Sequence, residues 1–216
     1  MIHIEAETLG EAWLGIARRV LAEGRASVYD GLPIRELPHA MLEVRHPDPG
    51  DATIARHADP ERLAWMRANF TDHALVHELG DARSYASRLF DYAATGTDQV
   101  AWVIARLRDD PTSRSATITT FEPLTDTSYI PCVSMLDFWI PVEAVDLVVY
   151  AHSIDFGAKG YGNLVQLADI QARVAGELGR PIGSLTFIIK SAHVYETEYS
   201  YMTGVLGSAA PGAIAR

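Results

Sequence analysis

Residues 185–195 read LTFIIKSAHVY and are the stretch of sequence that says most about the fold. The run Phe187-Ile188-Ile189 is rich in β-branched and aromatic residues, which predicts a long final strand over residues 185–194. His193 and Tyr195 stand two residues apart, so their side chains point to the same face of that strand. Polar groups at such positions are costly in a core unless they are paired. They therefore indicate a cleft near the strand end.

The rest of the chain alternates between helical and strand-like patterns. Thr8 can cap a helix over residues 9–23 that Gly24 ends. Further helices are predicted at 61–69, 84–92, 98–108 and 164–178, and further strands at 26–29, 40–45, 116–120, 133–140 and 145–152. The stretch 46–60 is predicted to be a surface loop, and the Gly/Ala-rich end 204–216 to be loose. With no repeat and no linker, residues 1–216 are predicted to form a single α+β domain with a central mixed β-sheet flanked by helices.

Composition excludes several classes of function. The chain has 216 residues, and 28 Asp and Glu outnumber 18 Lys and Arg, giving a net charge of −10. This excess argues against binding to nucleic acids or anionic membranes, where Lys and Arg supply most of the affinity. The single cysteine allows no internal disulfide, and no Cys/His spacing predicts a metal site. Because no targeting signal or membrane-length apolar run is present, we expect a cytoplasmic protein.

Cys132 is the candidate nucleophile. It follows Pro131 at the start of an apolar strand, and His152 ends the next strand. A nearby cation, either His152 or Arg114, would lower the pKa of the thiol and make it reactive. From these residues alone, a Cys/His hydrolase with His152 or His193 as base is one interpretation.

Several short segments taken together make the sequence more specific. They are Tyr85-Ala86-Ser87-Arg88-Leu89, Asp98-Gln99-Val100, Asp110-Pro111-Thr112-Ser113-Arg114, Pro131-Cys132, His152-Ser153-Ile154-Asp155, Asn163 and Ser191-Ala192-His193-Val194-Tyr195. In order and spacing this set resembles the thymidylate synthase family, which includes pyrimidine nucleotide hydroxymethylases, and it is most similar to the shorter archaeal-type members. The resemblance covers about residues 84–200 and, more weakly, 9–47.

The resemblance implies the fold and chemistry of that family. Cys132 would add to C6 of a pyrimidine and activate C5 toward the one-carbon unit of 5,10-methylenetetrahydrofolate. Tyr85 would support a water chain near the ring, and Asp155 would orient the folate or the water network. The residues implied to bind a pyrimidine nucleotide or nucleoside are Arg114, His152, Ser153, Asn163, His193 and Tyr195, with Asn163 indicating a uracil base and Arg114 reaching a phosphate across a homodimer.

Four of these residues have simpler interpretations as well. Tyr195 is also suited to simple packing on its strand, with its hydroxyl in water. Asn163 is equally suited to capping a helix, and Asp155 to forming a turn before Gly157. Arg114, taken alone, is typical of a protein surface. A second hypothesis keeps the fold without folate: Cys132 acts on another heterocycle, or the protein only binds a nucleotide.

The sequence also departs from the family pattern. His152 and Ser115 stand where the family usually carries arginines that grip a 5′-phosphate. The phosphate is then bound more weakly, or by Arg35 or Arg88, or the substrate carries none.

Glu61 is the best candidate for the upstream catalytic glutamate, although its position favours the simpler interpretation of a first-turn acid of a helix. The segment 70–77, expected to shield the reacting carbon, contains no tryptophan. Water would then reach that carbon, so hydroxymethylation is predicted to compete with methylation.

Overall fold

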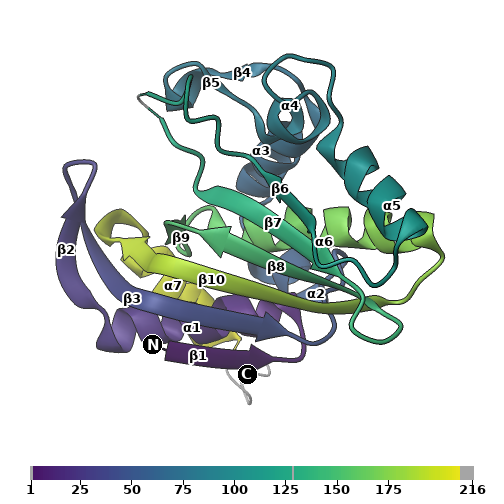
Figure 1. Cartoon of the computed structure of the whole chain (residues 1–216). Coiled ribbons are helices and arrows are strands. Elements are labelled where there is room, and N and C mark those ends of the chain that lie inside the picture. Colours follow the sequence, from purple (N-terminus) through teal and green to yellow (C-terminus); the bar gives the residue numbers. More distant parts are fainter. Residues whose placement is uncertain (1, 128, 210–216) are drawn as a thin grey trace.

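The central feature of the computed structural model, which describes residues 2–127 and 129–209, is a mixed sheet. Its strands follow the order β1-β3-β10-β8-β7-β6, with β2 paired to β3 and β9 paired to β10 (Figure 1). The bounds are β1 Ile2–Ala6, β2 Arg25–Tyr29, β3 Leu32–Val44, β6 Ala116–Thr119, β7 Val133–Trp139, β8 Val145–Ala151, β9 Ile154–Asp155 and β10 Ile182–Tyr195. A small second sheet pairs β4 Leu75–Val76 with β5 Ala82–Arg83. The predicted α+β fold with a mixed sheet is confirmed.

The helices of the described residues pack on this sheet or on one another. They are α1 Leu9–Glu23, α2 Ala52–His57, α3 Pro60–Thr71, α4 Tyr85–Phe90, α5 Gln99–Asp109, α6 Gly160–Leu178 and α7 Tyr199–Ser208, with short 3-10 turns η1 His77–Leu79 and η2 Glu196–Glu198. Helix α1 packs on β3 and β10, and α6 packs on β8 and β10 (Figure 1). Trp13 of α1 is fully buried against Tyr161, and its indole N–H donates to the carbonyl of Phe156 at 3.0 Å. This contact fixes the segment that joins β9 to α6.

Most predicted helices and strands are confirmed within a few residues. The Thr8 cap is present, since its side chain accepts from the amide of Glu11, and Gly24 follows the end of α1. The loop prediction for 46–60 is wrong in part: α2 forms there because the Asp51 carboxylate accepts from the amides of Ile54 and Gly10. The prediction of a loose end from residue 204 is also wrong as far as 208, which α7 includes, and residues 210–216 lie outside the described part.

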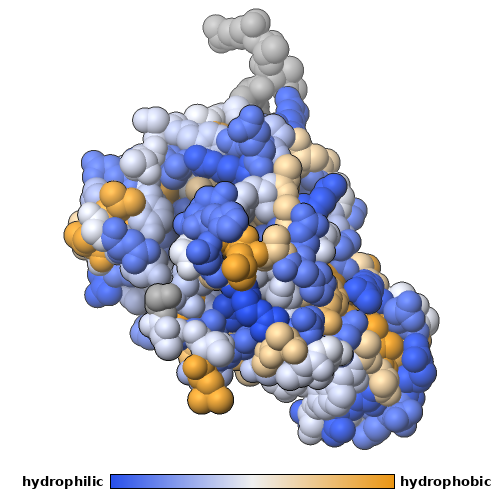
Figure 2. All heavy atoms as spheres, turned by 90° about the horizontal axis from the view of Figure 1, so that it is seen from above, coloured by the Kyte–Doolittle hydropathy of each residue, from blue (hydrophilic) through white to orange (hydrophobic). Residues whose placement is uncertain are grey.

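The other face of the sheet carries no helix from α1 or α6. Register brings Met41, Ile188, Tyr150 and Met135 into one row across β3, β10, β8 and β7. Ile188 is 40% exposed and Met135 is 37% exposed, so this row is an open apolar surface. Seen from above, by contrast, the molecule is mostly hydrophilic, with hydrophobic residues in small separate groups (Figure 2).

None of the helices in the described part of the chain has the length and hydrophobicity that crossing a membrane requires.

Candidate functional site

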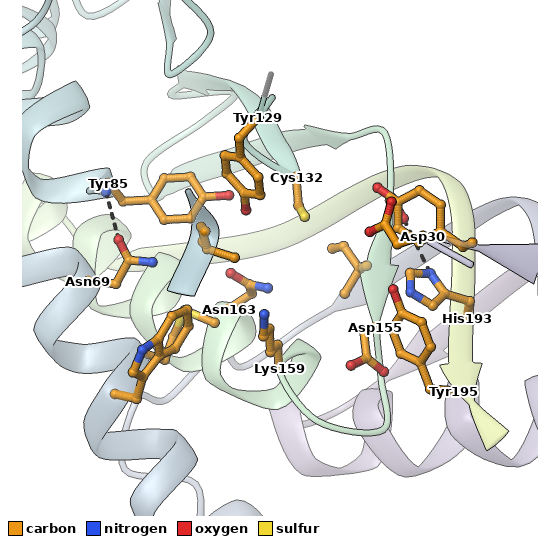
Figure 3. Close-up of a pocket in the computed structure, with 16 residues that line it drawn as sticks. Asp30, Asn69, Tyr85, Tyr129, Cys132, Asp155, Lys159, Asn163, His193 and Tyr195 are labelled. Carbon is orange, nitrogen blue, oxygen red and sulfur yellow. Dashed lines mark hydrogen bonds between the residues drawn. The ribbon is translucent and has the colours of Figure 1, made fainter. Parts of the chain in front are cut away.

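A pocket at one end of the sheet contains the thiol of Cys132. It encloses about 650 Å³ of space, part of it open to solvent. Cys132 enters it from the residue just before β7, and Figure 3 shows its sulfur pointing into the pocket. The backbone is held there because the Cys132 carbonyl accepts a hydrogen bond from the backbone amide of His152. This bond joins the start of β7 to the end of the neighbouring strand β8.

Tyr85 and Tyr129 stand beside this thiol (Figure 3). Tyr85 is the first residue of α4, and its hydroxyl accepts from the amide of Val133 at 3.0 Å. Its own amide donates to Asn69 of α3 at 3.0 Å, so two helices fix the position of its ring. The Tyr85 phenol is buried, and burial raises its pKa well above the usual range. It is therefore a neutral hydroxyl at physiological pH.

The reactivity of Cys132 is set by opposing effects. Burial raises the pKa of the thiol, whereas a hydrogen bond with Tyr129 and the positive charge of Lys159 lower it. The carboxylate of Asp155 raises it further. Thiolate formation therefore depends on Tyr129 and Lys159, which are the two groups favouring the charged form by the largest amounts.

Asn163 lies in the first turn of α6, which begins at Gly160 rather than at residue 164. Asn163 therefore does not cap the helix, and its backbone amide donates to the backbone carbonyl of Lys159. Its side chain is 4% exposed and lines the pocket. Within the described residues its Oδ1 atom has no hydrogen-bond partner. A buried acceptor without a partner is costly, and in this pocket the Oδ1 atom is available to a hydrogen-bond donor on a bound molecule.

Asp155 and Lys159 form the floor of the pocket between β9 and α6 (Figure 3). Asp155 serves as a turn former as well, because its carboxylate accepts from the amide of Gly157 at 2.9 Å. Burial raises the pKa of Asp155 to about 6. The Lys159 amine lies over the indole of Trp65, 5.1 Å from the ring centroid.

His193 and Tyr195 enter the same pocket from the end of β10, as their spacing predicts. Their ring centroids are 5.2 Å apart. The Oγ of Ser153 lies 3.3 Å from Nδ1 of His193, and the ring of Tyr29 packs edge-on against His193. Burial lowers the pKa of His193 to about 4, so its imidazole is neutral. Its Nε2 is a second buried atom without a partner among the described residues.

Three predicted residues lie outside this pocket. Glu61 is exposed in the first turn of α3 and lines a separate groove with Arg62, so the structure does not bring it to the thiol. Arg114 is exposed just before β6. His152 is half-buried beside the pocket without lining it, and burial lowers its pKa.

The structure adds residues that sequence reasoning missed. Asn69 and Trp65 come from α3, four residues apart and so on one helix face. Trp65 therefore lines the pocket from outside the segment 70–77, in which the family resemblance predicts an aromatic shield. Tyr129 was detectable from its place three residues before Cys132. Asp30 is in the β2–β3 turn and carries no signal beyond a turn-forming Asp-Gly pair.

Within the described ranges, no three His, Cys, Asp or Glu side chains gather as metal ligands. The arrangement offers a half-buried thiol, a neutral histidine, a protonatable carboxyl and an amide, which suits covalent chemistry on a polar heterocycle.

Comparison with known proteins identifies the family. Residues 51–210 match the thymidylate synthase family model. The chain belongs to the thymidylate synthase family. It is 29% identical over 213 residues to a protein of Methanosarcina acetivorans named "Putative thymidylate synthase", covering 94% of each chain. It is 27% identical to a protein of the same name from Methanothermobacter marburgensis, covering 91% of this chain and 94% of the relative.

A bifunctional dihydrofolate reductase-thymidylate synthase of Paramecium tetraurelia is 26% identical over 134 residues, which is 57% of this chain and 29% of that protein. Family membership makes the chain a one-carbon transferase of a folate-dependent family. The hydrolase interpretation is therefore set aside.

Proposed function

We propose that this protein transfers a one-carbon unit to C5 of a uracil-type nucleotide or nucleoside, as part of specialised nucleoside metabolism, through a covalent adduct between Cys132 and C6. One observation carries the proposal. The thiol shares its pocket with two buried polar atoms that have no partner among the described residues, Asn163 Oδ1 and His193 Nε2. A nucleophile beside paired recognition atoms is what addition to a pyrimidine ring requires.

Cys132 supplies the covalent step. Its thiolate forms a bond to C6, the C5=C6 electron pair moves toward the C4 oxygen, and C5 becomes nucleophilic. C5 would then bond to the one-carbon unit and lose its proton. Hydride supplied by the folate would give a methyl product and hydroxide from water a hydroxymethyl product, and either addition would expel the Cys132 thiolate from C6 and restore the C5=C6 double bond. Tyr129 and Lys159 favour the thiolate, and the Tyr85 hydroxyl lies beside the reacting ring as a proton relay.

Asn163 and β10 supply recognition. The Asn163 Oδ1 accepts the N3–H of uracil, while its amide nitrogen donates to a ring carbonyl. His193 and Tyr195 hold a sugar hydroxyl, and Ser153 orients His193 through Nδ1 so that Nε2 faces the ligand. Asp155 orders the water network at the floor of the pocket. It does so as a protonated carboxyl below its pKa of about 6 and as a carboxylate above it.

The pocket also fits a folate. Trp65, Leu79 and Asn69 line one end, where an aromatic ring beside an amide suits a flat, polar-edged ring such as a pterin. When bound, 5,10-methylenetetrahydrofolate supplies the one-carbon unit to C5. Trp65 limits the access of water to this end of the pocket. How well its indole covers the reacting carbon therefore decides the ratio of methyl to hydroxymethyl product.

Two further parts of the proposal concern assembly. Residues 1–216 act as a single domain, and two copies form a homodimer through the open sheet face. The row of Met41, Ile188, Tyr150 and Met135 supports this, because a contiguous apolar surface on a sheet favours burial against a partner. Arg114 is exposed, as a residue that serves the neighbouring copy must be.

Tritium release from C5-labelled uracil nucleotides and nucleosides tests the proposal, because exchange at C5 requires thiol addition at C6. We expect release by the wild type and none by Cys132→Ala, with Ser134→Ala as the matched control that keeps release. Release that needs added methylenetetrahydrofolate favours one-carbon transfer, whereas release without any product in its presence favours the hypothesis without folate. No release from any uracil or cytosine substrate by folded protein would refute the proposed function.

A further inference from the structure

The charged groups in the pocket are unevenly distributed. Among the described residues, those lining it include two acids, Asp30 and Asp155, and one cation, Lys159. The Lys159 amine is held over Trp65 at the end formed by α3 and α6. The end formed by β10 therefore presents Asp30 beside His193, without a cation of its own chain (Figure 3).

The arginines that the sequence pattern offers for a phosphate site are engaged elsewhere. Arg88 is 2% exposed and makes two 2.7 Å bonds to the Asp126 carboxylate, with a third to the carbonyl of Thr120. Arg35 donates to the carbonyl of Gly24 and does not line the pocket. Neither side chain reaches a ligand bound at Cys132.

Histidine does not replace them. His152 lies outside the lining, and burial lowers its pKa, so it carries little charge at pH 7. His193 is neutral for the same reason, its pKa being about 4. A phosphate needs charged donors, preferably the fork of an arginine, to offset the loss of its hydration. Arg114, the remaining candidate from the sequence pattern, does not line this pocket, so it contacts a ligand there only if the proposed homodimer brings it from the neighbouring copy.

Asp30 is placed to face the sugar end. It stands in the tight turn between β2 and β3, where Asp30 and Gly31 take left-handed φ values of 50° and 75°. The preceding residue, Tyr29, packs against His193 at 5.5 Å and Tyr195 at 6.5 Å between ring centroids. These contacts hold the turn against the two residues proposed to bind the sugar. A carboxylate there accepts hydrogen bonds from hydroxyl groups and repels a phosphate dianion.

We propose that the pocket selects an unphosphorylated nucleoside, with Asp30 accepting a hydrogen bond from a sugar hydroxyl and excluding 5′-phosphorylated substrates. The unpartnered Nε2 of His193 provides the second group for the same sugar. Asp30 is then a specificity-determining residue, which sets the discrimination between nucleoside and nucleotide. The inference rests on the proposed function and narrows its substrate class.

Tritium release from C5-labelled uridine, deoxyuridine and their 5′-monophosphates tests this choice. We expect kcat/KM for the better nucleoside to exceed that for its monophosphate by about tenfold, from the repulsion between the phosphate and the Asp30 carboxylate at the rim of the pocket. Asp30→Asn keeps the size of the side chain and removes the charge, so it should narrow this ratio mainly by improving use of the monophosphate. Asp48→Asn, in another exposed turn away from the pocket, should leave the ratio unchanged.

The outcomes separate the two proposals. Release from monophosphates equal to or faster than from nucleosides overturns the nucleoside inference and leaves the proposed function standing. The same holds if Arg114→Ala abolishes release from monophosphates, because a second copy then supplies the phosphate ligand. An unchanged ratio in Asp30→Asn overturns the role of Asp30. No release from any of the four substrates overturns the proposed function itself.

Discussion

Gly162 and Gly176 lie on the same helix, α6, and alanine should have opposite effects at the two positions. A Cβ at Gly162 would stand 2.9 Å from both Cβ and Cγ of Met66 on α3. A Cβ at Gly176 would meet nothing within 4 Å. The comparison therefore isolates the close approach of α3 and α6, the two helices that carry Trp65 and Asn163 into the pocket.

The magnitudes follow from two terms. Alanine in a helix is favoured over glycine by about 1 kcal/mol, and this is the full effect expected at Gly176. At Gly162 the contact is roughly 0.6 to 1 Å shorter than normal carbon–carbon contact, and the Cβ of Met66 cannot rotate away because it is fixed to the backbone of α3. Overpacking of this kind costs about 2 to 3 kcal/mol, which leaves a net loss of about 1 to 2 kcal/mol.

Thermal unfolding followed by circular dichroism measures both effects. For a chain of this size we expect Tm to fall by about 2 to 8 °C in Gly162→Ala and to rise by about 2 to 4 °C in Gly176→Ala. Urea unfolding at 25 °C gives the free energies directly. If Gly162→Ala raises Tm as much as Gly176→Ala does, α3 and α6 do not approach as closely as described, and the placement of Trp65 against Lys159 is refuted with it.

Three other outcomes are expected. Burial raises the pKa of Asp155 from 3.8 to about 6 in the folded protein, so its stabilising effect is complete below pH 3.8 and is lost as the pH rises through 6. Urea titrations should show the unfolding free energy of the wild type falling relative to that of Asp155→Asn between these two pH values. Parallel curves for the two proteins would contradict this. Tyr129→Phe removes a group that lowers the pKa of the Cys132 thiol, so alkylation by iodoacetamide at pH 8 should slow severalfold while Tyr201→Phe matches the wild type; equal rates in both variants would count against the role of Tyr129. Ile188→Lys places a charge on the open sheet face and should convert the proposed homodimer to a monomer in light scattering, whereas an unchanged mass would argue against dimerisation through that face.

Part of the pocket was predictable because the spacing of residues along a strand determines which face of the sheet their side chains lie on. His193 and Tyr195 share a face of β10 by their separation of two, and both line the pocket. Cys132 and Asp155 lie next to strand ends, at β7 and β9, so sheet register brings them to one edge. The sequence pattern of these residues already resembled the family that comparison then showed.

Helix α3 was not predictable in the same way. Glu61 and Trp65 are both plausible functional residues from their type, and the helix has no strong apolar stripe in its sequence to say which face packs inward. Contact with α6 and α4 turns Trp65 and Asn69 into the pocket and leaves Glu61 at the exposed first turn. Asn163 shows the same limit: its role as a cap or a ligand-facing amide depended on whether α6 begins at residue 160 or 164.

The sequence by itself determined the α+β class, most of the helices and strands, and the lone thiol as the candidate nucleophile, and its motifs resembled the family. The class and the elements follow from periodicity and spacing, which are properties of neighbours along the chain. Only the tertiary structure decided that Asp30 faces the pocket while Arg88 is bound to Asp126. The physical reason is that the field around a ligand is set by charges from distant segments, and the positions of those charges depend on how a hairpin turn and helices pack around the sheet.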